Sequence, residues 1–144
     1  MKTDKIKKIL VPLDGSKNSL RGLDMAITLA RISDATITGI YVVYAPSHSE
    51  FGKTDSIQKG AYEKIKQFME SAKTKAAQNE IVFNGKILHG DIGYQIVSYA
   101  QSKKHKFDLI VIGHRGRSTV KEAFLGSTSH YVIHASNIPV LIVK

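Results

Sequence analysis

The sequence has no cysteine, few aromatic residues and no long hydrophobic run. Without cysteine, disulfides, thiolate catalysis and cysteine-ligated metal sites are all excluded. No apolar run approaches the roughly 20 residues that a membrane-spanning helix needs. Aromatic residues make up only 8% of the chain, which leaves little to stack on nucleic-acid bases. What remains is a chain of 144 residues, 42% of them hydrophobic, which predicts one globular domain spanning residues 1–144.

The net charge of +9 favours an anionic partner, such as a nucleotide, a nucleic acid or an acidic protein. The lysines are spread along the chain, with one modest cluster at Lys2, Lys5, Lys7 and Lys8. We therefore interpret the charge as a solvated basic surface and do not expect nucleic acid as the main ligand. The N-terminal lysines and the apolar residues after them resemble a signal peptide, but Asp14 ends that run and no small-residue cleavage site follows. We expect a cytoplasmic protein.

Short apolar runs rich in β-branched residues alternate with amphipathic segments along the chain. The runs predict strands at 5–13, 35–44, 81–91, 107–112 and 138–144. Apolar residues at three- and four-residue spacing predict helices at about 16–32, 57–78, 91–100 and 127–135. Ser16 and Asp91 are candidate N-caps. The alternation is typical of an open α/β fold, in which helices cover both faces of a parallel sheet. Ligands of such sheets bind at the carboxyl ends of the strands.

Several patterns that would indicate other chemistry are incomplete. The stretch FGKT resembles the end of a phosphate-binding P-loop, but Ser47 stands where that motif needs glycine. His130 and His134 have the spacing of a zinc-binding helix, but Tyr131 replaces the glutamate of zinc proteases and no third ligand suggests itself. We interpret both as exposed histidines. The carboxylates at the strand ends stand alone and the chain has no G-x-S-x-G motif, so acid–base or serine-based hydrolysis is poorly supported.

The stretch GHRGRSTVKEAFLGSTS, after the fourth predicted strand, is the strongest candidate site. Glycine at positions 113, 116 and 126 lets the backbone pass close to a ligand and adopt positive φ where needed, so that N–H groups converge on an anion. The alternative is that these glycines only shape a loop and that Ser127 is an N-cap. A turn and a phosphate site therefore both remain open on this stretch alone.

The start of the last predicted helix also suits a phosphate. Its free N–H groups and the positive end of its dipole attract anions. The hydroxyls of Ser127, Thr128 and Ser129 add donors, and Arg115 or Arg117 could pair with outer phosphates.

Asp14 follows the first predicted strand. If the first and fourth strands are neighbours, its carboxylate lies across the crevice from the glycine loop, where it could accept hydrogen bonds from ribose hydroxyls. The alternative role for Asp14 is to cap the first helix, a task that Ser16 could fill instead.

Three motifs together resemble the universal stress protein family. They are KKILVPLDGS near the N-terminus, the pattern G-x2-G-x9-G-[ST] that begins at Gly113, and the terminal PVLIVK. The resemblance covers essentially the whole chain. It implies a Rossmann-like, adenine nucleotide alpha hydrolase-like fold with a five-stranded parallel sheet of order 3-2-1-4-5. It also implies an adenine nucleotide (ATP, ADP or AMP) over the ends of strands one and four, with Mg²⁺ or Mn²⁺ on its phosphates.

The glycine pattern resembles that of the family's ATP-binding branch, which implies a role for each matching residue. Pro12 and Asp14 would lie beside adenine and ribose, and the backbone of Val42 would hydrogen-bond the base. The residues that would wrap the ribose and phosphates are Gly113, His114, Arg115 and Gly116. Those that would hold the phosphate chain are Gly126, Ser127, Thr128 and Ser129.

The function that this resemblance implies is an ATP-binding stress-response module in which nucleotide state alters a partner contact. The alternatives are a slow ATPase or self-phosphorylating enzyme, and a nucleotide-free dimerisation module. The last strand, from Ile138 to Val143, ends the chain at a sheet edge with no charge before Lys144. We expect two copies to pair along it as a homodimer.

Overall fold

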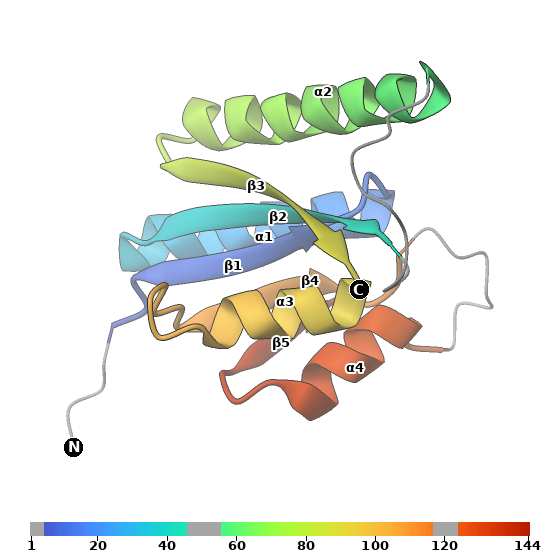
Figure 1. Cartoon of the computed structure of the whole chain (residues 1–144). Coiled ribbons are helices and arrows are strands. Elements are labelled where there is room, and N and C mark those ends of the chain that lie inside the picture. Colours follow the sequence, from blue (N-terminus) through green and yellow to red (C-terminus); the bar gives the residue numbers. More distant parts are fainter. Residues whose placement is uncertain (1–4, 46–55, 117–123) are drawn as a thin grey trace.

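The computed structural model describes residues 5–45, 56–116 and 124–144, which contain five strands and four helices in strict alternation (Figure 1). The strands are β1 (Lys8–Leu13), β2 (Thr36–Tyr44), β3 (Phe83–Gly90), β4 (Leu109–Gly113) and β5 (Val140–Val143). The helices are α1 (Lys17–Ser33), α2 (Ser56–Gln78), α3 (Ile92–Gln101) and α4 (Ser127–Ala135). None of these helices is both long and apolar enough to cross a membrane.

The five strands form one parallel sheet in the order β3-β2-β1-β4-β5, which confirms the expected fold class. β1 pairs with β2 along its whole length and with β4 at Ile9↔Leu109 and Leu10↔Ile110. Strand order reverses between β1 and β4. In open α/β sheets this switch point opens a crevice beyond the carboxyl ends of the strands.

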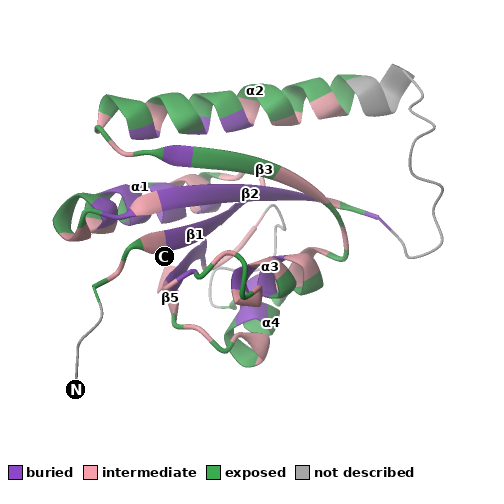
Figure 2. Cartoon of the chain, turned by 60° about the vertical axis from the view of Figure 1, so that its left-hand side comes forward, coloured by how far each residue is buried: buried purple, intermediate pink, exposed green. Residues whose placement is uncertain are grey.

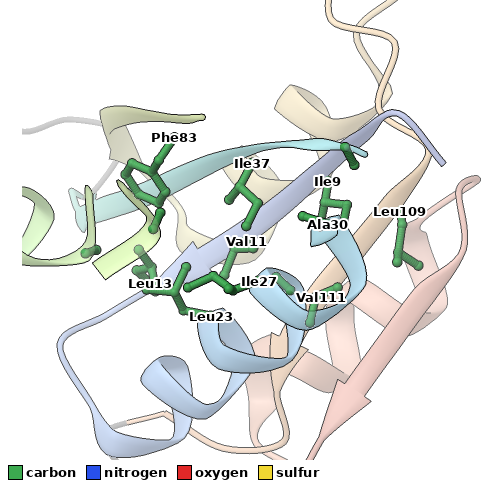
Figure 3. Packing of buried hydrophobic residues seen from close by; sticks show 14 of the residues in the cluster. Ile9, Val11, Leu13, Leu23, Ile27, Ala30, Ile37, Phe83, Leu109 and Val111 are labelled. Atoms are coloured by element: carbon green, nitrogen blue, oxygen red, sulfur yellow. The ribbon is translucent and has the colours of Figure 1, made fainter. Parts of the chain in front are cut away.

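Helices α1 and α2 cover one face of the sheet, and α3 and α4 cover the other (Figure 1). Successive residues of β1 point to opposite faces. Ile9, Val11 and Leu13 join the cluster under α1 and α2 (Figure 3), and Leu10 joins the cluster under α3 and α4. Both faces of the central strands are therefore buried, as Figure 2 shows. This burial explains why their sequences are almost continuously apolar.

Some strands are shorter than the sequence indicates. β4 begins at Leu109, and the preceding Asp108 turns its carboxylate to accept the backbone N–H groups of Lys7 and Lys8, at 2.8 and 2.9 Å. β5 begins at Val140, because Pro139 has no N–H to donate, although its carbonyl accepts from the backbone N–H of Ile110 at 2.9 Å. The apolar residues before both strands still pack against the core.

Candidate functional site

A cleft opens at the carboxyl ends of β1, β2 and β4 and encloses about 530 Å³, its open mouth included. The apolar side chains that line it include Pro12, Ile40, Val42, Ile92, Ile96 and Ile112. The polar or backbone-rich positions that line it include Asp14, Gly113, Arg115, Gly116, Thr128 and Ser129. The cleft therefore offers an apolar surface next to a polar one, at the point where strand order reverses.

The structure brings most of the expected site residues together in this cleft. Three of them, His114, Gly126 and Ser127, are not part of its lining. Sequence analysis did not identify the isoleucines of the lining. The sequence does contain a pattern for them: Ile92 and Ile96 stand one helical turn apart, and Ile40 alternates with the buried Val42 on β2. However, the same spacing also predicts ordinary core residues, so it does not single out a ligand site.

The turn between β1 and α1 fixes the position of Asp14. Ser16 caps α1, since its hydroxyl oxygen accepts from the Ser19 N–H at 3.1 Å, so the first helix does not depend on Asp14 for its cap. One Asp14 oxygen, Oδ1, accepts from the Ser16 N–H at 2.8 Å. The other, Oδ2, lies 2.5 Å from the place where a Cβ on Gly116 would stand. The carboxylate thus lies across the crevice from the glycine loop.

The glycines of the loop are required because neighbouring atoms lie too close for a side chain, and not because their backbone has positive φ. Among the described residues, only Gly15 and Gly90 are glycines with positive φ, so Gly113, Gly116 and Gly126 do not use the left-handed backbone that glycine allows. Instead, a Cβ on Gly113 would stand 2.6 Å from the carbonyl oxygen of Asn18. A Cβ on Gly126 would stand 3.2 Å from Cα of Arg115.

Several donors expected to face a ligand already bind the protein itself. The N–H of His114 donates to the Val143 carbonyl at 2.8 Å, and the N–H of Gly126 donates to the His114 carbonyl at 2.8 Å. The buried Ser129 hydroxyl donates to the Gly113 carbonyl at 2.7 Å. The Gly126 and Ser129 bonds fasten the start of α4 to the end of β4, and the His114 bond joins the end of β4 to β5. Their first contribution to the site is therefore to position the helix.

The N-cap residue of α4 is a glycine, which has no side chain to cap the helix. Gly126, with φ −62° and ψ 153°, is the N-cap residue and makes no side-chain hydrogen bond. The alternative that Ser127 is the N-cap is therefore wrong, because Ser127 is the first helical residue. The first N–H groups of a helix have no partner within the helix. Of these first residues, Thr128 and Ser129 line the cleft, at the end of the helix where the dipole is positive.

One buried side-chain nitrogen beside the cleft makes no hydrogen bond within the part of the chain that the structure describes. Nδ1 of His114 is buried and has no hydrogen-bond partner among the described residues. Buried polar atoms are normally satisfied by protein, water or ligand. Among the described residues, the groups with clearly shifted pKa values lie elsewhere: burial raises the pKa of Tyr99, and burial followed by nearby lysines lowers the pKa of His105. Neither residue lines the cleft.

Comparison with known proteins gives consistent matches along the whole chain. The model of the universal stress protein family matches residues 5–144. Universal stress protein YxiE of Bacillus subtilis (strain 168) is 34% identical over 153 residues, covering 95% of this chain and 98% of that protein. Universal stress protein MJ0531 of Methanocaldococcus jannaschii is 33% identical over 142 residues, covering 96% of this chain and 82% of that protein.

Solved structures share the fold. Universal stress protein UspA from Lactobacillus plantarum superposes with a TM-score of 0.84 at 24% identity, covering 99% of this chain and all of that one. A universal stress protein in complex with cAMP has a TM-score of 0.74 at 25% identity, covering 98% of each chain. The protein from Archaeoglobus fulgidus in complex with dAMP has a TM-score of 0.74 at 20% identity, covering 98% of this chain and all of that one.

Proposed function

This chain belongs to the universal stress protein family, and we propose that it is an ATP-binding member that acts as a cytoplasmic homodimer. One observation carries the nucleotide proposal: the apolar lining, the Asp14 carboxylate and the first turn of α4, whose N-cap is a glycine, meet in one cleft. An adenine nucleotide has parts that match each of these surfaces. Two structural neighbours bound to cAMP and dAMP support an adenine nucleotide as the ligand class.

The adenine would lie against the apolar lining. Pro12 and Ile112 come from the two central strands, and Val42 lies one residue beyond the last β1–β2 pair, Leu13↔Tyr41. The backbone of Val42 therefore lies beyond the hydrogen-bonded pairs that β2 makes with β1. Its peptide groups could form a hydrogen bond with the edge of a base. Burying a flat apolar ring here would contribute roughly 25 cal/mol for each Å² of apolar surface removed from water.

The ribose would lie at Asp14. An ionised carboxylate has about four lone-pair sites, so the bond from the Ser16 N–H leaves capacity to accept from ribose hydroxyls. The nearby Gly116 keeps space beside Oδ2, because any larger residue would place its Cβ against that oxygen. This arrangement explains why glycine and aspartate face each other across the crevice.

The phosphates would lie at the start of α4. Free N–H groups and the helix dipole stabilise an anion there by roughly 0.3–1 kcal/mol, and by about 2 kcal/mol in a partly buried site. Hydroxyls of Ser127 and Thr128 and the charge of Arg115 would add to this. Mg²⁺ or Mn²⁺ would sit on phosphate oxygens and keep most of its waters. The described residues gather no group of three or more histidine, aspartate or glutamate side chains for a metal.

The homodimer would form along β5. This strand pairs with β4 on one side, and its four residues, Val140, Leu141, Ile142 and Val143, are each only partly buried. A second copy pairing antiparallel about a two-fold axis would cover this apolar edge. In such an assembly, nucleotide binding beside α4 would act close to the interface, since the Gly126 N–H at the start of α4 donates to the His114 carbonyl and the His114 N–H donates to Val143 of β5.

Calorimetry with ATP, AMP and adenosine tests the nucleotide proposal. Ser127→Ala should weaken ATP by two- to about a hundredfold, because a hydrogen bond contributes about 0.5–1.5 kcal/mol, or up to about 3 when its partner is charged. It should leave adenosine unchanged. Asp14→Asn should weaken ATP and adenosine alike. Ser98→Ala, at an exposed position of α3, is the matched control and should change neither.

Mass analysis of the ligand carried through purification gives an independent readout. Folded protein that carries no adenine nucleotide and shows no ATP affinity tighter than millimolar would refute the proposal. In that case the glycine loop would be only a turn, and the nucleotide-free dimerisation module would be the better account.

A further inference from the structure

Helix α4 carries two histidines on its exposed surface, one helical turn apart. The rings of His130 and His134 are 4.4 Å apart between centroids and are tilted by 50° to each other. Both residues are exposed, whereas Ser129 and Val132 on the inward side of the helix are buried. Neither histidine lines the cleft. The pair is therefore a surface feature that the nucleotide proposal does not use.

The ring separation can be compared with the geometry of a metal chelate. An imidazole nitrogen binds an ion at about 2.0–2.1 Å, which places the ring centroid about 3.2 Å from the ion. Two such rings at a right angle about one ion would have centroids about 4.5 Å apart, and a tetrahedral angle would require about 5.2 Å. The observed centroid separation of 4.4 Å is short enough for the right-angle arrangement once both rings turn a nitrogen toward one ion. Tetragonal Cu²⁺ and Ni²⁺ favour that angle between neighbouring ligands.

We propose that His130 and His134 chelate a divalent transition-metal ion, with Cu²⁺ bound most tightly and water completing its coordination. Imidazole suits Cu²⁺, Ni²⁺ and Zn²⁺, and affinities in this series peak at Cu²⁺. His134 lies in the last turn of α4, where the helix dipole is negative and favours a cation. Since both side chains are exposed, their rings can turn toward a common ion without disturbing the core.

This metal site is distinct from the one at which an ion would accompany a nucleotide. Mg²⁺ prefers oxygen ligands and would sit on phosphates at the start of α4. The histidine pair offers nitrogen and occupies the middle and end of the same helix. A titration on nucleotide-free protein therefore excludes the phosphate-bound ion, and variants of His130 and His134 assign the remaining binding to the pair.

The test is a Cu²⁺ titration of the full chain without a histidine tag, followed by calorimetry in a weakly competing buffer and by electron paramagnetic resonance. We expect one ion per chain and a spectrum that shows two nitrogen ligands. His130→Gln or His134→Gln should each weaken Cu²⁺ at least about tenfold, because a chelate becomes a single ligand. Ni²⁺ and Zn²⁺ should bind more weakly than Cu²⁺. His89→Gln, an exposed histidine on β3, is the matched control and should bind as the natural chain does.

Thermal unfolding supplies a second readout. Cu²⁺ should raise the Tm of the natural chain and of His89→Gln, since an ion that binds only the folded helix stabilises it, and should leave the double variant unchanged. Equal Cu²⁺ affinity in the natural chain and in His130→Gln plus His134→Gln would overturn the proposal. So would a spectrum with a single nitrogen ligand.

Discussion

The same substitution, glycine to alanine, should have three different outcomes at three positions of this protein. At Gly113 the new methyl group would stand 2.6 Å from the backbone carbonyl oxygen of Asn18, so α1 and β4 must separate. At Gly60, in α2, nothing lies within 4 Å of the new group. At Gly116 it would stand 2.5 Å from Oδ2 of Asp14, the far end of a side chain that can move.

The magnitudes follow from these contacts. Overpacking against backbone costs about 1–3 kcal/mol, and alanine returns about 0.4–1 kcal/mol by restricting the unfolded chain, so Gly113→Ala should lose about 1.3 kcal/mol, and at most about 2.6 kcal/mol. Gly60→Ala should gain about 1 kcal/mol from helix propensity. For a domain of this size, each kcal/mol shifts Tm by about 2–4 °C. Gly116→Ala should leave Tm nearly unchanged and weaken adenosine, because Asp14 is displaced.

Urea denaturation gives the free energy of unfolding for each variant, and calorimetry gives the affinity for adenosine. A change of midpoint at constant slope would show that the free energy of unfolding changed while the surface exposed on unfolding stayed the same. A Gly113→Ala variant as stable as Gly60→Ala would refute the claim that this glycine is required by the approach of α1. If Gly116→Ala bound adenosine normally, Asp14 would not contact the ribose.

Three further outcomes are expected. Ser129→Ala removes the buried donor to the Gly113 carbonyl and should cost about 1–3 kcal/mol of unfolding free energy, measured in urea. Val140→Asp plus Ile142→Lys should give a monomer in light scattering at micromolar concentration, whereas an intact dimer would exclude β5 as the interface. Burial, and then nearby lysines, lower the pKa of His105 below its ordinary value of 6.5. As pH falls through that value the unfolded state takes up the proton first, so stability decreases; His105→Gln should flatten the decrease in urea midpoint between about pH 7.5 and about pH 5.5.

Local signals allowed the elements and their caps to be predicted from the sequence. Ser16 and Asp91 are both N-caps in the structure, since each follows a strand and precedes an amphipathic helix. The α/β class follows from the alternation of elements. The strand order was not readable from periodicity and came only from the family resemblance, because spacing within an element says nothing about which strands become neighbours.

What the sequence did not reveal depends on contacts between distant residues. The requirement for glycine at Gly113 comes from the Asn18 carbonyl, and the late start of β4 comes with the contact between Asp108 and the backbone of Lys7 and Lys8. The hydrogen bond from the Ser129 hydroxyl to the Gly113 carbonyl likewise depends on the packing of α4 beside β4. The residues of the candidate site could be predicted from the sequence. Which of their hydrogen-bond donors already bond to other groups of the protein could not.

The central place of β1 in the sheet has a consequence for synthesis of the chain. The ribosome makes β1 first, but its neighbour β4 comes about a hundred residues later. Lys7, just before β1, and Asp108, just before β4, form a hydrogen bond across 101 positions of the sequence. At about 5–20 residues per second on the ribosome, β1 waits about 5–20 seconds for β4 to emerge. Strands β1, β2 and β3 can meanwhile pair beneath α1 and α2, whose cluster they largely supply. One apolar edge of β1 stays open during that interval, and open edges pair readily with other chains. The nascent protein is therefore most exposed to misassociation, and most in need of a chaperone, between completion of β3 and completion of β4.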